Sequence, residues 1–240
     1  MQGWGNTMIC TIHQPEYLPW LGFFDRVVKS DVFVLLDDVG YEKNQFNNRN
    51  KIKTNNEAGW QYITVPVQGR SPNKKINQIL IDNTKNWGQS HLSAIKNSYA
   101  KAPYFKQYYG LFEEIFGKKW EKISDVDVCL QQQVFDFLGL KVQVEVSSNM
   151  PVEGQKTQRL VNICKAVGAD TYLAGPGYGN GTYMDLELFK KENIKVIFQE
   201  FTHPEYPQQY MEKGFLPGMS IIDLLFNCGP ESLQIITGKK

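Results

Sequence analysis

Residues 9–38, ICTIHQPEYLPWLGFFDRVVKSDVFVLLDD, contain two short apolar segments on either side of an amphipathic one. The apolar segments, 9–12 and 32–36, have the length and the β-branched content of buried strands. Between them, from Leu21 to Val28, apolar side chains recur at the three- and four-residue spacing of a helix face. Two such strands joined by a helix pair in parallel, in a sheet covered on both faces. The stretch therefore predicts an α/β fold.

Three further segments of the strand type follow much later in the chain, at 141–146, 171–174 and 195–199. Helical patterns separate them, so the alternation of strand and helix returns. The chain is therefore expected to form a Rossmann-like, doubly wound α/β fold with a mainly parallel five-stranded sheet.

The middle of the chain departs from this alternation. Residues 40–83 are expected to be a β-rich insertion with strands at 61–67 and 76–81, because two apolar segments flank a Gly-Arg-Ser-Pro turn. Residues 84–140 carry helical patterns and are expected to be a helical segment. No Pro/Gly/Ser-rich or charged linker divides the chain, so residues 8–240 are predicted to be a single α/β domain that contains both parts.

Composition narrows the classes of function. The 240 residues include 26 Lys and Arg and 25 Asp and Glu, so the net charge of +1 argues against nucleic-acid binding over the whole surface. The four cysteines lie in apolar surroundings without C-x-x-C spacing and are expected to be buried thiols. No run reaches the roughly 18 apolar residues of a membrane helix, and residues 1–7 do not resemble a signal peptide. A cytoplasmic protein without a metal site or a hydrolase triad is expected.

Polar residues follow the carboxyl end of each predicted strand. They are His13 and Gln14, Asp37 and Asp38, Ser147 to Asn149, Gly175 to Gly177, and Glu200 to His203. In a doubly wound sheet these ends meet along one edge, where ligands bind. His13 is a candidate for proton transfer, with a loop hydrogen bond as the alternative role. Asp37 and Asp38 are candidate catalytic carboxylates, either of which could orient His13. Alternatively, one caps the turn that follows while the other reaches a hydroxyl, an ammonium group or a magnesium ion.

Two loops are candidates for binding an anion. Residues 43–51, KNQFNNRNK, are dense in hydrogen-bond donors. Arg49 suits a bidentate contact with phosphate, and Lys43 would add charge, although a solvated loop is the alternative. Residues 175–181 contain four glycines, whose backbone N–H groups can approach an anion, but they match no standard phosphate-binding motif.

Several of these stretches resemble the WbqC-like family of bacterial proteins. The resemblance rests on IHQPEYLPWLGFFD, SDVFVLLDDV and NRNKIK, then on YLAGPG, YMD, HPEYPQ and MSIIDLLFN, and spans roughly residues 8–229. It implies that further residues of these motifs contact substrate. They are Gln14, Tyr17, Trp20, Asn48, Gly175, Pro176, Gly177, Tyr183, Asp185 and His203. Asp185 also suits the first turn of a helix, where an acid favours the helix dipole.

The resemblance also implies a function in O-antigen or related surface-polysaccharide biosynthesis, with glycine transfer suggested for some members. The expected reaction transfers an acyl or aminoacyl group to the amine of a nucleotide-linked amino sugar. A neutral His13 would take the proton, N–H groups near Gly175 would stabilise the oxyanion, and Arg49 would hold the diphosphate. The expected partners are that sugar and an acyl or aminoacyl donor. A charged tRNA that serves as this donor is the one nucleic acid that could be a partner. The sequence assigns no cofactor.

Two alternatives remain from the sequence. The loop and helix after the first strand resemble nucleotidyltransferases with an H-x-G-H signature, although Trp20-Leu21-Gly22-Phe23 keeps only the glycine. The resemblance thus favours the architecture of a nucleotidylyltransferase but not its chemistry. The other alternative is a non-catalytic protein that binds nucleotide sugars in the same pathway.

Overall fold

The computed structural model describes residues 7–69, 73–176 and 184–238. The chain groups into two compact units, and each is assembled from separate stretches. The first unit comprises Met1–Gln14, Asp25–Asp38 and Lys141–Thr202, and the second Pro15–Phe24, Val39–Leu140 and His203–Lys240. The expected β-rich insertion and helical segment both fall in the second unit. That residues 8–240 behave as one domain stays a prediction.

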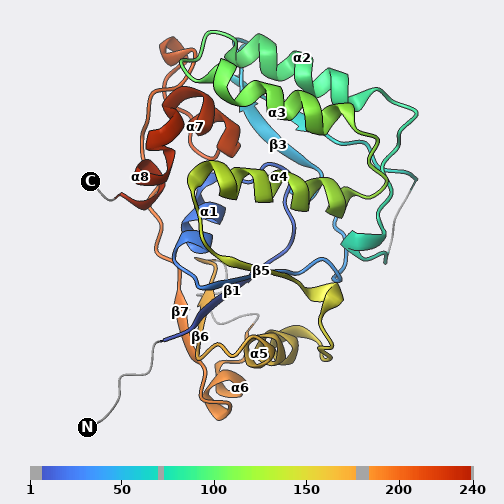
Figure 1. The fold of residues 1–240 in the computed structure, drawn as a ribbon, viewed down its shortest axis with the longest axis vertical. Coiled ribbons are helices and arrows are strands. Elements are labelled where there is room, and N and C mark those ends of the chain that lie inside the picture. Colours follow the sequence, from blue (N-terminus) through green and yellow to red (C-terminus); the bar gives the residue numbers. More distant parts are fainter. Residues whose placement is uncertain (1–6, 70–72, 177–183, 239–240) are drawn as a thin grey trace. The chain divides into compact units, whose positions relative to one another are not determined.

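The first unit is built around a five-stranded sheet (Figure 1). In spatial order its strands are β5 (Gln143–Val146), β2 (Val32–Leu35), β1 (Ile9–His13), β6 (Thr171–Ala174) and β7 (Lys195–Phe198). Every neighbouring pair is parallel, so the predicted Rossmann-like sheet is confirmed. Strand order runs outward in one direction from β1 to β5 and in the other from β6 to β7, so it reverses between β1 and β6.

Helices lie on both faces of this sheet. On one face, α5 (Lys156–Ala166) and α6 (Leu186–Lys191) bury an apolar core with alternate strand residues such as Cys10 and Ile12. Because successive side chains of a strand point to opposite faces, His13 points to the other face. Figure 1 shows α1 (Leu21–Val28) on that side, and its residues from Asp25 onward belong to this unit.

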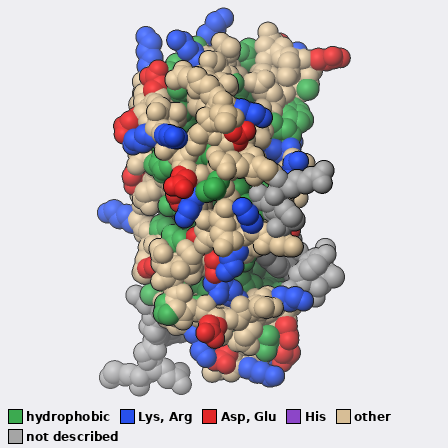
Figure 2. Space-filling view, turned by 90° about the vertical axis from the view of Figure 1, so that its right-hand side faces the viewer, with side chains coloured by type: hydrophobic (Ala, Val, Ile, Leu, Met, Phe, Trp, Pro, Cys, Tyr) green, Lys and Arg blue, Asp and Glu red, His purple; other side chains and the backbone are tan. Residues whose placement is uncertain are grey.

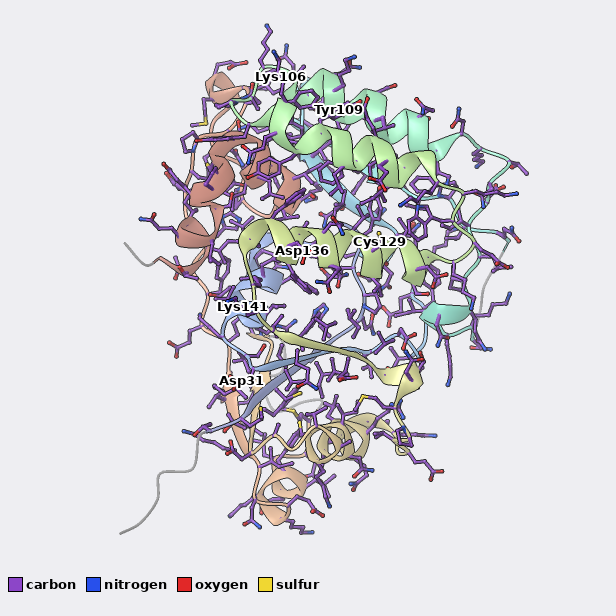
Figure 3. The ribbon with its side chains drawn as sticks, viewed as in Figure 1. Asp31, Lys106, Tyr109, Cys129, Asp136 and Lys141 are labelled. Carbon is purple, nitrogen blue, oxygen red and sulfur yellow. The ribbon has the colours of Figure 1, made fainter. Side chains whose placement is uncertain are left out.

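The second unit combines a two-stranded antiparallel sheet with helices. β3 (Arg49–Lys53) pairs with β4 (Trp60–Thr64). The helices are α2 (Trp87–Tyr99), α3 (Phe105–Gly117), α4 (Ile123–Leu138), α7 (Ile221–Cys228) and α8 (Ser232–Thr237). Figure 3 shows Lys106 and Tyr109 on α3, and the Tyr109 hydroxyl donates to the Leu92 carbonyl of α2 at 3.3 Å.

The strands of the insertion differ in part from the prediction. The segment predicted at 61–67 is present as β4, but Ile76–Gln78 is a short 3-10 helix. The partner of β4 is instead β3, in an Asn- and Lys-rich stretch without an alternating apolar pattern. Asn50 of β3 is fully buried, and its side-chain amide donates to the Leu18 carbonyl at 2.8 Å. A polar residue occupies an inward position here because a hydrogen bond satisfies it.

α2 and α3 approach each other closely at Gly88. A Cβ atom added to Gly88 would lie 2.3 Å from the backbone oxygen of Phe116. The crossing therefore requires a residue without a side chain. On α3, a Cβ added to Gly110 would have no heavy atom within 4 Å, so this second glycine is not required by packing.

We expect Gly88→Ala to lower the free energy of unfolding by about 1–3 kcal/mol, because the added methyl group meets a backbone carbonyl. Gly110→Ala is the matched control. It should leave stability unchanged or raise it by up to about 1 kcal/mol, because alanine has the higher helix propensity. Urea unfolding followed by circular dichroism measures both variants. Equal effects at the two positions would contradict the close crossing.

Candidate functional site

The carboxyl ends of β1 and β6 lie where the strand order of the first unit reverses. His13 ends β1, and Gly175 and Pro176 follow β6, so three predicted residues flank this point. Arg26 of α1 also lies here, since a Cβ added to Gly175 would be 2.7 Å from its Nη1 atom. Arg26 is 4% exposed and was not among the predicted residues. Ligands of doubly wound sheets bind at such a reversal point.

The His13 ring is neutral at pH 7. Its Nδ1 atom lies 2.8 Å from the Gln14 carbonyl oxygen, and because a carbonyl only accepts, Nδ1 carries the proton. Burial, together with the Arg26 guanidinium, lowers the pKa of His13 from 6.5 to about 3. A proton acceptor must be neutral, but a pKa this low makes a weak base at pH 7. Proton transfer by His13 stays a prediction.

Asp37 and Asp38 bind the end of β5 and the helix α5. Asp37 accepts the backbone N–H of Ser148 at 3.0 Å and the Ser148 hydroxyl at 2.8 Å. Asp38 accepts the Ser147 hydroxyl at 2.6 Å and pairs with Nη2 of Arg159 at 2.6 Å. These contacts hold β2, β5 and α5 together, which is a structural role. A catalytic role for the two carboxylates stays a prediction.

Three other predicted residues of the first unit, Gly177, Tyr183 and Asp185, follow β6 in the sequence. Asp185 caps α6, because its carboxylate accepts the backbone N–H of Glu187 at 3.0 Å. Its own backbone N–H donates to the Thr157 hydroxyl at 3.1 Å. Gly177 and Tyr183 lie outside the described residues. Substrate contacts by these residues stay predictions.

The second unit contains a pocket of about 910 Å³, a volume that suits a nucleotide-sized ligand. Its lining comes from the loop before β3, the end of β4 and the start of α2, and includes Tyr41, Lys43, Asn48, Lys85, Trp87 and His91. Lys43 and Asn48 are predicted substrate contacts. The sequence did not single out the other four, although Lys85-Asn86-Trp87 at the start of a predicted helix was a usable signal.

Two lysines and the start of a helix contribute positive charge to the lining of this pocket. Lys43 and Lys85 are exposed there, and α2 begins at Trp87. The first N–H groups of a helix have no partner within the helix, and the Asn86 side chain makes no capping hydrogen bond to them. The part of the pocket at the start of α2 therefore suits an anionic group. Among the described residues on the face drawn in Figure 2, basic and acidic side chains are interleaved.

His91 connects the pocket to the buried Tyr17. Its Nε2 atom lies 3.1 Å from the Thr64 carbonyl, so Nε2 carries the proton and Nδ1 accepts the Tyr17 hydroxyl at 2.8 Å. Burial lowers the pKa of His91 to about 4, so the ring is neutral at pH 7. Tyr17, a predicted substrate contact, is fully buried and supports this wall of the pocket instead of facing solvent.

Amide side chains hold the segment 15–18, which comes just before α1. Asn47, Gln131 and Asn50 donate to the carbonyl oxygens of Pro15, Glu16 and Leu18 at 2.7, 2.7 and 2.8 Å. Some side-chain donors of the Asn-rich stretch 43–51 thus form hydrogen bonds with backbone carbonyl groups of the protein itself. These hydrogen bonds bring together two motifs that are separate in the sequence, HQPEYLPW and NRNKIK. Burial and the Glu16 carboxylate hold the pKa of nearby Asp127 well above its usual range.

Arg49 lies on the β3–β4 hairpin. Its guanidinium carbon is 4.2 Å from the centre of the Tyr62 ring, and its Nη2 atom donates to the Asn44 carbonyl. Lys51 lies in the same way over Trp60, at 4.4 Å. Among the described residues, Arg49 is next in sequence to the pocket residue Asn48 but does not itself line the pocket. Its contact with phosphate stays a prediction.

Trp20 and His203 pack together in the second unit. Their rings are stacked, with centres 6.3 Å apart. His203 donates from Nδ1 to the Pro204 carbonyl at 2.9 Å, and its Nε2 atom accepts the Gly218 N–H at 3.1 Å. Burial lowers the pKa of His203. These bonds fix the loop between His203 and Gly218, and substrate binding by either ring stays a prediction.

Two further features concern the described residues alone. In residues 7–69, 73–176 and 184–238, no helix is long and apolar enough to cross a membrane. Within the same ranges, no group of three or more His, Cys, Asp or Glu side chains is placed to hold a metal ion. All four cysteines are free; Cys10, Cys164 and Cys228 are buried as expected, whereas Cys129 is only half-buried, which differs from the prediction.

We expect the ring signals of His91 and His13 to titrate with midpoints near pH 4 and pH 3 in an NMR titration. Because both folded pKa values lie below about 6.5, the unfolded chain binds more protons in acid. The stability that the neutral rings contribute is therefore complete above about pH 6.5 and is lost as the pH falls toward 4. The urea-unfolded protein gives the reference. A midpoint near 6.5 for His91 in the folded protein would contradict its bonds to Tyr17 and Thr64.

Comparison with known proteins agrees with the resemblance seen in the sequence. The model of the WbqC-like protein family matches residues 14–235, nearly the whole chain. The uncharacterized protein Rv1507c of Mycobacterium tuberculosis is 34% identical over 224 residues, which cover 92% of this chain and 94% of that protein. No solved structure matches. The chain therefore belongs to the WbqC-like protein family.

Proposed function

We propose that this protein is a transferase of surface-polysaccharide biosynthesis, such as that of O-antigen. It would transfer an acyl or aminoacyl group, such as glycyl, to the amine of a nucleotide-linked amino sugar. Membership of the WbqC-like family over residues 14–235 is consistent with this proposal. The substrates would be the nucleotide sugar and an activated acyl or aminoacyl donor.

The pocket of the second unit is the observation that carries the proposal. Its volume of about 910 Å³ is sufficient for a nucleotide sugar. Lys43, Lys85 and the first N–H groups of α2 supply the positive charge that a diphosphate requires. Trp87 offers an aromatic side chain, and Asn44 and Ser90 of the lining offer polar side chains for the sugar.

The first unit supports the proposal in a more general way. Its strand order reverses between β1 and β6, which is where doubly wound sheets bind nucleotides and related ligands. His13, Gly175 and the buried Arg26 lie at this point. In the proposed reaction, His13 takes the proton of the attacking amine, and a substrate that raises its pKa would make it a better base.

Two other functions fit parts of the structure. A nucleotidylyltransferase would share the parallel sheet with a loop after its first strand, but the helix that follows lacks both histidines of the H-x-G-H signature. A non-catalytic protein that binds nucleotide sugars would need only the pocket. The three functions differ in their products, so one assay separates them.

Mass spectrometry of the purified protein with nucleotide-linked amino sugars and activated amino acids tests the proposal. A product heavier by one acyl or aminoacyl group supports it. Release of pyrophosphate from a nucleoside triphosphate together with a nucleotidylated product, and without an acylated one, would favour nucleotidylyl transfer instead. Binding of a nucleotide sugar without any product, over a panel of donors that includes thioesters, charged tRNA, and ATP with free amino acid, would indicate the non-catalytic protein.

We expect Lys85→Ala to weaken the binding of a nucleotide sugar by on the order of tenfold, or about 1.4 kcal/mol, because an exposed charged contact with phosphate is lost. Lys96→Ala is the matched control, because Lys96 is an exposed lysine in the last turn of the same helix. Isothermal titration calorimetry measures both variants. An unchanged Kd for Lys85→Ala, or an equal loss in the control, would reject this pocket as the phosphate site.

A further inference from the structure

Several buried oxygen atoms of the second unit have no hydrogen-bond partner among the described residues. They are both carboxylate oxygens of Asp127, Oε1 of Gln131, Oδ1 of Asn48 and the hydroxyl of Tyr41. Asp127 is 0% exposed and Gln131 is 1% exposed. Buried polar atoms are nearly always paired in proteins, so a group of unpaired ones requires an explanation.

Three of these residues, Asp127, Gln131 and Tyr41, belong to one region of the second unit. Asp127 and Gln131 are one turn apart on α4 and therefore lie on the same face of the helix. The Gln131 amide donates to the Glu16 backbone at 2.7 Å, which brings Glu16 to the same place. Asp127 in turn interacts electrostatically with Glu16 and Tyr41.

The orientation of the amide groups determines which of their atoms are unpaired. Gln131 and Asn48 both use their N–H groups, on the carbonyls of Glu16 and Val65 at 2.7 and 2.9 Å. Their carbonyl oxygens are therefore the atoms left over. Apart from the Tyr41 hydroxyl, which can also donate, the unpaired atoms are acceptors, so what they lack is a positively charged or hydrogen-donating group.

We propose that Asp127 and Gln131, together with the neighbouring Glu16, form a buried site for a divalent cation of the oxygen-binding kind, Mg²⁺ or Ca²⁺. Carboxylate and amide oxygens are the ligands that these ions prefer. The Asp127 and Glu16 carboxylates together balance the charge of such an ion. The site has only two acidic side chains, so it is not one of the groups of three or more that simple metal-site patterns describe.

This proposal does not depend on the transferase function. The ion would hold α4 against the segment 15–18, which is bound to the loop that lines the pocket through Asn47. Its binding would therefore stabilise the folded protein whatever the pocket accepts. The readout is the stability and metal content of the free protein.

The test uses the full chain, first stripped of metal with a chelator and then titrated separately with CaCl₂ and MgCl₂. Calorimetry is expected to show one ion bound per chain for at least one of the two salts. The melting temperature should rise by roughly 5–10 °C at a concentration one hundred times the Kd, because only the folded state contains the site. No binding and no rise with either ion would overturn the proposal.

Asp127→Asn keeps the shape of the side chain and removes its charge, so it should weaken ion binding at least tenfold. In the absence of metal it should melt no lower than the wild type, because an amide replaces a buried and unpaired carboxyl group. Asp136→Asn is the control, because Asp136 is an exposed acid of the same helix (Figure 3). Equal ion binding by Asp127→Asn and Asp136→Asn would overturn the proposal.

A second readout applies to the wild type alone, should Asp127→Asn be insoluble. Terbium replaces calcium at oxygen sites and emits when a nearby tyrosine is excited. Tyr17 and Tyr41, which interact electrostatically with Asp127, are close enough to sensitise it. Emission that calcium displaces supports the site, and absence of sensitised emission from a protein that binds calcium in the calorimetry overturns it.

Discussion

The second unit depends on hydrogen bonds between side-chain amides and the backbone of the segment 15–18. Prolines at positions 15 and 19 interrupt regular structure here, and Leu18 has a positive φ of 46°, so the carbonyl groups of this segment have no helix or strand to join. Asn47, Asn50 and Gln131 supply the missing donors from the loop, from β3 and from α4. Because an unpaired buried carbonyl is costly, these bonds fix the position of all three elements. The pocket and the unpaired oxygens near Asp127 both lie beside this arrangement.

The parallel strands of the fold could be predicted from local sequence patterns. The parallel strands are short, and β1, β2 and β6 are almost wholly buried and mostly apolar, so their existence depends little on distant residues. β3 was missed for the opposite reason. Its inward side chain Asn50 is polar and becomes a core residue only through its bond to Leu18, 32 positions away in the sequence. The order of the strands is likewise a property of long-range pairing, which periodicity does not contain.

The candidate site also contains residues that local sequence predicts and residues whose role depends on distant contacts. Lys43 and Asn48 could be predicted because a donor-rich loop is visible in the sequence. His91 could not, because its neutral state results from burial and from bonds to Tyr17 and Thr64, at 74 and 27 positions' separation. The role of Asp37 likewise depends on Ser148, 111 positions away. A carboxylate that looks available in the sequence is therefore engaged in the structure.

The interleaving of the two units has a consequence for how the protein is made. The central strand β1 is synthesised well before β6, yet its Thr11 hydroxyl donates to the Leu173 carbonyl of β6, 162 residues later. At the usual rates of synthesis of about 5–20 residues per second, β1 waits roughly 8–30 seconds for β6 to leave the ribosome. During that time an apolar strand edge is unpaired and able to associate with other chains. Rapid expression at high temperature would therefore favour aggregation, and a fragment that stops before residue 171 would lack the neighbour that closes this edge.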